Sequence, residues 1–218
     1  MSSIFINGTK YSVSTGLAAA VAVTAITNAN PAVASAATPP ADGSILIVNS
    51  GWSELDETVA RSANADADSF ELEGVDTTST TRFPAGQGAG SVRAVDTWVP
   101  LDQVRDVQVA GGEQQYFQYQ YVEDRSSRQR QKPTFKNAIT LTFQLDHDPA
   151  KAWYQALIEA DAARDPVVVR GILPNGAVLL YYAYPSFNKV PTGTVNENLQ
   201  NTATFSLLAD PIRYEAAE

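Results

Sequence analysis

The clearest pattern of apolar and polar positions lies between residues 132 and 186, where strand, helix and hairpin signals follow one another. From Thr134 to Asp146, apolar side chains alternate with Thr and Gln, which is the two-residue period of a half-buried strand. The apolar positions are Ile139, Leu141, Phe143 and Leu145. The pattern therefore predicts one strand over residues 134–146 with a single face in the core.

A helix is predicted directly after this strand, over about residues 149–164. Asp148 is a suitable N-cap, and Pro149 fits the first helical position because its missing N–H would have no partner there. Apolar side chains then recur at i, i+3, i+4 and i+7, which predicts one stripe packed on the sheet. That stripe is Trp153, Ala156, Leu157 and Ala160. Tyr154 and Ile158 lie beside it.

A hairpin is predicted next, because apolar runs at 167–173 and 177–184 flank Pro174-Asn175-Gly176. Proline presets φ for a turn and glycine takes the left-handed position, so the connection should be a three-residue loop. Residues 185–200 are expected to be irregular. A closing strand is expected over 202–208, with Ala203, Phe205 and Leu207 on one face.

Short strands separated by turn residues recur before residue 97, which is typical of a small all-β unit. The predicted elements are a first hairpin at 4–13 and strands at 18–26, 45–48, 58–63, 69–75 and 92–95, with loops at 28–42 and 86–90. A helix over residues 17–20 is an alternative for the start of the 18–26 segment. We therefore expect residues 1–97 to hold a hairpin and a small all-β unit. Residues 98–218 should form a larger β core with the helix.

The segment between these parts carries an aromatic run and a basic loop. Phe117, Tyr119 and Tyr121 alternate with Gln, which favours a strand over 114–122 whose aromatic face is buried. A preceding strand is predicted from Val104, Val107 and Val109, before Gly111-Gly112. The charged loop Glu123–Pro133 follows, and its basic residues are Arg125, Arg128, Arg130 and Lys132.

Composition narrows the classes of function. The formal charge of −9 argues against a surface built to neutralise phosphates. The absence of Cys excludes disulfides, zinc–thiolate sites and cysteine nucleophiles. The apolar run 16–26 could suggest a secretory leader, but only Lys10 precedes it and that region carries the hairpin signal, so we expect no leader. No apolar run is long enough for a membrane span.

Candidate chemistry is sparse. Asp146-His147-Asp148 is the one place where a metal or acid–base site can be imagined, but these residues lie where a strand passes into a capped helix. The glycines at 86, 88 and 90 lack the strand-to-helix context of a phosphate loop, and no nucleophile-elbow pattern is present. We expect no enzyme activity, no metal and no cofactor.

The basic loop has three possible interpretations: a solvated loop, a nucleic-acid contact, or a contact with an acidic partner. The chain's own surplus of acid favours self-association, with Glu159, Asp161 and Asp165 on the helix as possible partners.

Several stretches of the sequence resemble one family. They are Ile26-Thr27-Asn28-Ala29-Asn30-Pro31, Phe70-Glu71-Leu72-Glu73-Gly74-Val75-Asp76, Phe83-Pro84-Ala85-Gly86, Gly111-Gly112-Glu113-Gln114 and Leu173-Pro174-Asn175-Gly176. Together they resemble the major tail tube proteins of long-tailed, non-contractile bacteriophages. The resemblance implies a mainly β, tail-tube type sandwich or barrel with a flanking helix.

The resemblance also implies a role. Six subunits form a ring whose inner wall is a β-barrel, and rings stack into a tube around a tape-measure protein. Tail terminator and tail-tip proteins would be further partners, and double-stranded DNA would pass through the tube without specific binding. The protein would be assembled in the host cytoplasm, would reside in the virion tail and would contact no membrane.

A long loop contacts the adjacent ring in that family, and Glu123–Pro133 matches it by order in the chain. The inter-subunit contacts that we expect are Arg125, Arg128, Arg130, Lys132, Tyr154 and Ile158. The unit within residues 1–97 would be an external decoration or would supply a core strand. Alternatives are an inner tube of a contractile tail, a tail terminator, a glycan-binding β-sandwich module, or a hydrolase using acidic residues.

Overall fold

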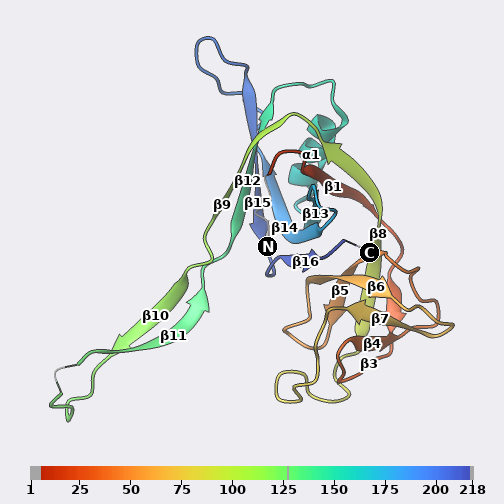
Figure 1. Ribbon diagram of the computed structural model, residues 1–218, viewed down its shortest axis with the longest axis vertical. Helices are drawn as coiled ribbons and strands as arrows, with labels where there is room; N and C mark the ends of the chain where they lie inside the picture. The colour runs from red at the N-terminus through yellow and green to blue at the C-terminus, as the bar shows by residue number, and fades with distance from the viewer. Residues whose placement is uncertain (1–5, 127, 217–218) are drawn as a thin grey trace.

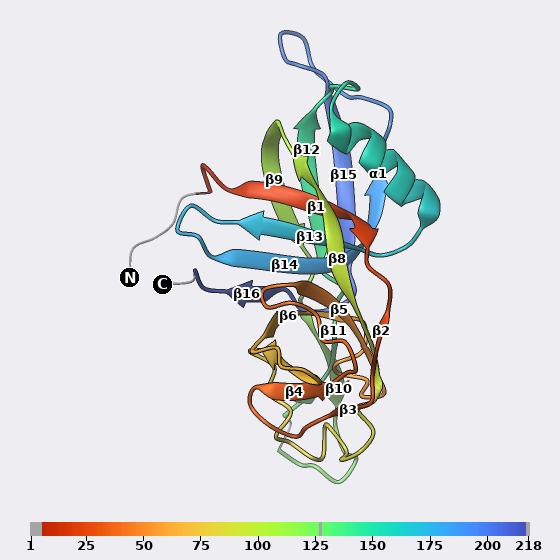
Figure 2. The same cartoon turned by 90° about the vertical axis from the view of Figure 1, so that its right-hand side faces the viewer.

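The computed structural model describes residues 6–126 and 128–216. Within them the fold is mainly β, with one helix and one large antiparallel sheet, which confirms the predicted class (Figures 1 and 2). The helix is α1, Ala152–Ala163. The strands are β1 Lys10–Leu17, β2 Val21–Val23, β3 Ala25–Ile26, β4 Ala32–Ser35, β5 Ile45–Ser50, β6 Thr58–Ala63, β7 Ser69–Glu73, β8 Gly90–Leu101, β9 Val104–Ala110, β10 Gln114–Tyr119, β11 Arg130–Lys136, β12 Thr140–Asp146, β13 Val167–Ile172, β14 Val178–Phe187, β15 Gln200–Leu207 and β16 Ile212–Tyr214.

A curved main sheet runs in the order β8-β1-β13-β14-β15-β12-β9, and β16 pairs beside β14. The apolar residues that alternate along these strands lie on one face, and α1 covers that face (Figure 2). The core between sheet and helix is built from Val13, Leu141, Phe143, Leu145, Val169, Ala203 and Phe205 of the strands with Trp153 and Leu157 of the helix. Burial of each large apolar side chain contributes about 1.5–3 kcal/mol, so this core dominates the stability of the main sheet.

Residues 18–94 form a second unit, in which β3-β4-β7-β6-β5-β8 are neighbours and β2 pairs with β8. Its own core contains Leu46, Trp52, Phe70, Leu72 and Phe83. Strand β8 belongs to both parts, because its first half pairs with β5 and its second half with β1. The division expected at residue 97 falls inside this strand, and β1 lies within the main sheet.

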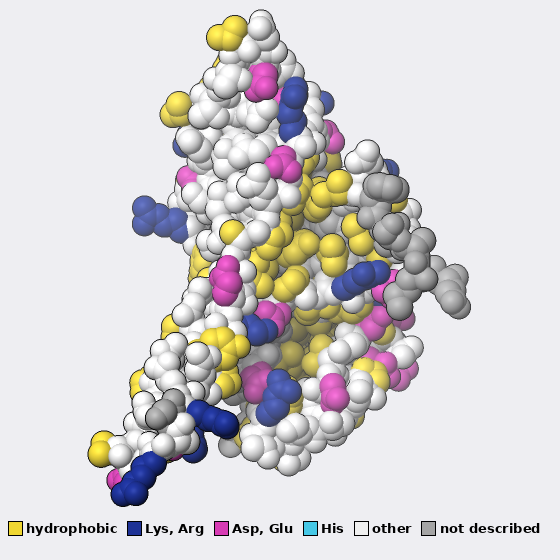
Figure 3. All heavy atoms as spheres, turned by 60° about the vertical axis from the view of Figure 1, so that its left-hand side comes forward, with side chains coloured by type: hydrophobic (Ala, Val, Ile, Leu, Met, Phe, Trp, Pro, Cys, Tyr) yellow, Lys and Arg dark blue, Asp and Glu magenta, His cyan; other side chains and the backbone are white. Residues whose placement is uncertain are grey.

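A third apolar cluster joins the two parts. Ile45, Ile47 and Val59 of the N-terminal unit pack on Val168, Leu180 and Tyr182, which lie on the face of the main sheet opposite the helix. The N-terminal unit therefore covers the part of that face that β13 and β14 form. In the space-filling view, the segment that carries β10 and β11 extends away from this body (Figure 3).

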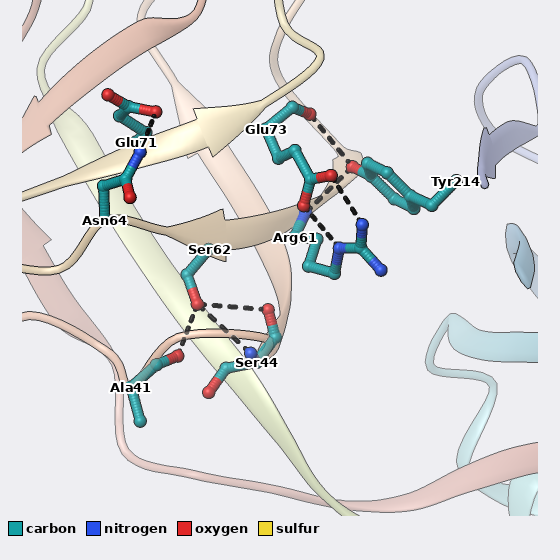
Figure 4. Close-up of polar contacts among 8 residues, drawn as sticks. All are labelled: Ala41, Ser44, Arg61, Ser62, Asn64, Glu71, Glu73 and Tyr214. Carbon is teal, nitrogen blue, oxygen red and sulfur yellow. Dashed lines mark hydrogen bonds and ion pairs between the residues drawn. The ribbon is translucent and has the colours of Figure 1, made fainter. Parts of the chain in front are cut away.

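Tyr214 adds polar contacts to the same junction (Figure 4). Its hydroxyl accepts the backbone N–H of Arg61 at 2.9 Å and donates to the carbonyl oxygen of Glu73 at 3.2 Å. The Arg61 guanidinium pairs with the Glu73 carboxylate and lies 4.4 Å from the centre of the Tyr214 ring. Burial raises the pKa of Tyr214, which further favours the protonated hydroxyl that donates to Glu73.

Most strand predictions for the N-terminal unit are confirmed, including 45–48, 58–63 and 69–75, where Phe70 and Leu72 point inward. The hairpin at 167–184 is also confirmed. Leu173 and Ala177 close its three-residue loop through an N–H···O bond of 2.8 Å, and Gly176 has φ +83°. In the predicted hairpin at 4–13, residues 4 and 5 lie outside the described residues.

The single strand predicted over 134–146 is wrong, because the structure has two strands there. β11 pairs with β10 in a separate two-stranded sheet, and residues 137–139 lie outside any strand. From Thr140 onward the prediction is confirmed, since Leu141, Phe143 and Leu145 are buried. The two-residue period keeps the same phase on both sides of residues 137–139, so it gives no sign of the break between β11 and β12.

The predicted start of the helix is also wrong. Lys151 directly precedes the first helical residue, and no side chain caps the helix. Asp148 and Pro149 form a preceding turn, in which the Asp148 carbonyl oxygen accepts the Lys151 N–H at 3.1 Å and its Oδ1 accepts the Ala150 N–H at 3.2 Å. The apolar stripe is confirmed, because Trp153, Ala156 and Leu157 are buried and Ala160 packs against the core.

Two segments expected to be loops contain strand residues. The segment 28–42 contains β4, which pairs with β7 and whose Ala32 and Ala34 are fully buried in the core of the N-terminal unit. The segment 185–200 begins with the end of β14, which pairs with β15. No helix in the described residues is long and apolar enough to cross a bilayer.

Candidate functional site

The most prominent feature outside the cores is a long hairpin that leaves the main sheet. β9 and β12 form its base, and the chain continues from them into β10 and β11. We call residues 114–136 the arm. Its two strands pair only with each other among the described residues, and Figures 1 and 2 show it at one end of the molecule.

A double glycine sets the direction of the arm. Gly111 and Gly112 have φ of +86° and +82°, a region that other residues rarely adopt. A Cβ at Gly111 would collide with the carbonyl oxygen of Ala138, in the segment that joins β11 to β12. Hydrogen bonds between Gly112 and Asn137 and between Asn137 and Glu113, of 3.2 and 3.0 Å, hold the bend.

The arm carries the basic residues singled out in the sequence, and all four are exposed. The expected loop over 123–133 is shorter than predicted, because Arg130 and Lys132 lie in β11. Arg130 pairs with Asp124 at 3.2 Å, and it is the one member of the set with an ion pair within the described residues. Residues 114–136 hold five basic and two acidic side chains, so the arm is net positive on a chain of net charge −9.

The prediction that the aromatic run is buried is wrong. Phe117 and Tyr121 are 61% and 59% exposed, and Tyr116 and Phe135 nearby are equally open to solvent. Phe117 stacks on Tyr119, with ring centroids 6.3 Å apart, so the rings contact one another rather than a core. A two-stranded ribbon has no layer behind it, so alternation in β10 marks a distinct face without burying it. Exposed aromatic side chains of this density are typical of interaction surfaces.

Tyr154 and Ile158 lie apart from the arm, at the other end of the molecule on α1 (Figures 1 and 2). Both are half-buried against the main core. The Tyr154 ring meets Phe187 edge to face, with centroids 5.4 Å apart. Within one copy the structure does not bring these two residues together with the basic set.

The Asp146-His147-Asp148 segment lies at the far end of β12 from the arm. Asp146 forms an ion pair with Arg105, whose guanidinium lowers the pKa of that carboxyl. His147 Nδ1 is 2.6 Å from Asn201 Oδ1. No group of three His, Cys, Asp or Glu residues in the described ranges is placed to hold a metal ion. The geometry is that of a polar strand end rather than of a reactive centre.

The face of the main sheet opposite the helix stays bare where the N-terminal unit does not cover it. The side chains there are mostly polar: Gln108 of β9, Thr140, Thr142 and Gln144 of β12, Thr202, Thr204 and Ser206 of β15, and Ser186 of β14. Tyr184 of β14, opposite Ser206, adds one exposed aromatic ring. Asp106 adds a negative charge. The basic side chain at its margin, Arg105, is paired with Asp146. The period in β12 and β15 shows these residues in the sequence, but only the pairing of four strands reveals one continuous polar face.

One border of this polar face is an unpaired strand edge. In the described part of the chain, β9 pairs with β12 and with no other strand. Val109 on this strand is 65% exposed. An open edge of seven residues exposes unsatisfied backbone N–H and C=O groups, which invites pairing with another strand.

Comparison with solved structures finds distant similarity to tail components. The tail of an empty GTA particle with C6 symmetry has 6% identity and a TM-score of 0.41, and covers 56% of this chain and 88% of its own. A sheath/tube terminator of an extracellular contractile injection system, PVC, in the extended state has 16% identity and a TM-score of 0.36, with coverage of 55% and 88%. The tube-terminating cap of the anti-feeding prophage has 16% identity and a TM-score of 0.35, with coverage of 56% and 84%. No curated protein sequence matches this chain.

A family description matches much more of the chain. The family is the phage tail tube protein, TTP, and the match covers residues 50–216. It includes the arm, the polar face, α1 and most of the N-terminal unit, and it extends over more than three quarters of the chain. The protein therefore belongs to the phage tail tube protein family and is a structural component of a phage tail.

Proposed function

We propose that this protein is the major subunit of the tail tube of a long-tailed, non-contractile phage. Six copies form a ring, and rings stack into a hollow conduit through which the genome leaves for the host. The observation that carries the proposal is the polar face of β9, β12, β15 and β14, which adjoins the unpaired edge of β9.

The polar face suits the wall of a channel for DNA. Threonine, serine and glutamine side chains keep the wall hydrated, and no unpaired Lys or Arg among the described residues of this face is available to hold a phosphate. Each phosphate contact would contribute a salt-dependent attraction that slows transit. A wall with a few acidic groups such as Asp106 instead repels the backbone weakly.

The open edge of β9 suits ring closure. Pairing with a strand of the next copy would satisfy its backbone groups and would continue the sheet around a common barrel. The same contact used head to tail by every copy closes into a ring when the rotation allows it. We place Tyr154, Ile158 and the arm among the remaining inter-subunit contacts, and the N-terminal unit outside the barrel wall as a decoration.

The partners follow from this arrangement. A tape-measure protein would occupy the channel during assembly, terminator and tail-tip proteins would close the two ends, and double-stranded DNA would pass without specific binding. Assembly would take place in the host cytoplasm, before the tail joins the virion.

Electron microscopy of the purified protein at high concentration tests the proposal. Rings with sixfold class averages and stacked tubes are expected. A protein that stays monomeric in every salt and concentration condition would refute it.

A double charge reversal on the arm tests the contribution of its basic residues. Arg128→Glu with Arg130→Glu should leave the monomer folded and shorten the tubes. The matched control is Arg164→Glu with Arg213→Glu, which changes the net charge equally at exposed positions outside the arm. Tubes of equal length from both double variants would remove the arm from the assembly contacts.

A further inference from the structure

A polar hollow of about 330 Å³ lies at the end of the main sheet farthest from the arm. It is lined by Gln103, Asp146, His147, Asp148, Asn198 and Leu199. These residues come from the start of β9, the end of β12 and the loop 188–199 that precedes β15. The Asp146-His147-Asp148 motif, which has no chemical role in the proposed function, forms much of its wall.

The hollow has acceptor capacity that its own chain leaves unused. Asp146 is occupied by Arg105 and by the side-chain amide of Asn198. The side-chain oxygens of Asp148 accept one backbone N–H, from Ala150, and form no ion pair within the described residues. A cationic side chain entering from outside would therefore meet an available carboxylate.

The loop 188–199, which supplies Asn198 and Leu199 to the hollow, carries exposed apolar side chains, and we call this loop the rim. Val190, Val195 and Leu199 on it are 69%, 89% and 52% exposed. The same loop also carries Glu197 and Lys189. Three exposed aliphatic side chains on one loop are typical of a contact surface.

The tip of the arm presents the complementary chemistry. Arg125 and Arg128 are exposed, and they have no ion pair within the described residues. Tyr121 is largely open to solvent, and Val122 is fully exposed. A positive and apolar tip thus corresponds to a negative and apolar hollow.

The two surfaces lie at opposite ends of the same strands. β9 starts beside Gln103 in the hollow and ends at the bend before the arm, and β12 runs back from the arm to Asp146. Figures 1 and 2 both place the arm and the loop 188–199 at opposite ends of the long axis of the molecule. An arm therefore cannot reach its own hollow, but copies repeated along this axis bring each arm to the hollow of the next copy.

We propose that the hollow is the receptor for the arm of the copy in the adjoining ring. Arg125 or Arg128 of one copy pairs with Asp148 of the next, while Tyr121 and Val122 pack on the rim. This inference rests on the proposed function, since it names the acceptor for a contact between stacked rings.

Two other acidic surfaces have to be separated from the hollow. On the helix, Glu159 accepts a hydrogen bond from Gln155 and Asp161 accepts the Phe187 N–H, so each, like Asp148, accepts one hydrogen bond. The N-terminal unit carries exposed carboxylates such as Asp66, but it lies at the same end of the molecule as the arm (Figures 1 and 2). Stacking along the long axis would move an arm away from this unit and toward the end of the molecule that holds both the hollow and α1, so the Glu159 control below separates these two surfaces.

Cross-linking between engineered cysteines tests the proposal, and the chain suits it because it contains no native Cys. Tubes of the variant Ser126→Cys with Asn198→Cys, which keeps Arg125, Arg128 and Asp148, are treated with a short bismaleimide. The expected product is a denaturation-resistant ladder of covalent multimers that extends beyond six copies, because each link joins one ring to the next. Two matched controls keep Ser126→Cys and place the second cysteine at Asp66 or Glu159.

The outcomes separate this inference from the proposed function. If tubes form but the ladder comes only from the Asp66 or Glu159 control, or from none of the three, the hollow is not the receptor and the tube remains. If the unmodified protein forms no rings, the proposed function fails first.

Charge exchange gives an independent readout. Arg128→Glu and Asp148→Lys should each shorten the tubes, and their combination should restore the tube length. Asp148→Asn removes the charge but keeps a side-chain oxygen that can accept the Ala150 N–H. Any effect of this variant on tube length therefore comes from the lost charge and not from disruption of the turn. Failure of the combination to lengthen tubes beyond either single reversal would overturn the pairing.

Discussion

Replacing Gly111 with alanine should misdirect the arm without unfolding the protein. Two costs combine at this position. Its φ of +86° lies in the left-handed half of the map, where a Cβ costs about 1–2 kcal/mol. The new Cβ would also collide with the carbonyl oxygen of Ala138, and overpacking of this kind costs about 1–3 kcal/mol. Because the obstacle is backbone, no side-chain rotation can relieve it, and the strands that lead into the arm must shift.

Gly86→Ala is the matched control for this change. Gly86 has φ +77°, so it shares the backbone cost, but the space that its new Cβ would occupy has no neighbouring atom within 4 Å, so the collision is absent. The difference between the two variants therefore isolates the collision. For a chain of this size each kcal/mol shifts Tm by about 2–4 °C, so Gly111→Ala should melt about 2–12 °C below Gly86→Ala.

Calorimetry of the monomer and microscopy of the assembled protein measure the two consequences. We expect Gly86→Ala to form tubes of normal length and Gly111→Ala to form few or none. Equal melting temperatures together with equal tube lengths would show that the bend at Gly111 has no role in directing the arm.

Three further predictions concern single side chains. Tyr214→Phe leaves the partly buried backbone N–H of Arg61 in β6 without its acceptor, so urea unfolding should show a loss of about 1–3 kcal/mol in the free energy of unfolding, against little change for the exposed Tyr184→Phe. Arg105 lowers the pKa of the Asp146 carboxyl in the folded protein, so the ionised carboxylate stabilises the fold above the pKa that Asp146 has in the unfolded chain. That stabilisation is lost as the pH falls through the folded-state pKa. The difference in Tm between the unmodified protein and Asp146→Asn should therefore shrink in acid. Phe135→Ser should change monomer stability by less than about 0.5 kcal/mol while reducing tube yield, because this ring is 67% exposed; a large stability loss would show that the ring is packed.

Much of the core could be predicted from periodicity alone. In β12 and β15 the apolar positions alternate over the whole strand, and each of them is buried as expected. The hairpin around Gly176 followed from turn chemistry that acts within a few residues. Periodicity and turn chemistry were sufficient for these elements, because neighbouring residues determine their conformation.

The arm shows where such rules end. Alternation in β10 identifies a face of aromatic rings, but whether a second layer covers that face depends on distant parts of the chain or on another copy. The same limit applies to β4, because alanine is only weakly hydrophobic and the alternation of Ala32 and Ala34 does not predict a buried strand. Asp148 and Pro149 satisfy the rules for a helix start and for a turn equally well, and the structure uses the turn.

The way the N-terminal unit is attached has a mechanical consequence. The chain enters it at Ala18 and leaves it at Ala94, and those two residues are joined by an N–H···O bond of 2.9 Å, so the unit is a single insertion on a narrow neck. A neck of this kind would ordinarily act as a hinge. Here the apolar cluster around Leu180 and the contacts of Tyr214 hold the unit against the main sheet, which limits its rotation about the neck. The outer radius of any assembly built from this protein should accordingly be constant along its length. Deleting the insertion would reduce that radius and would expose the apolar side chains Val168, Leu180 and Tyr182, which the insertion now covers.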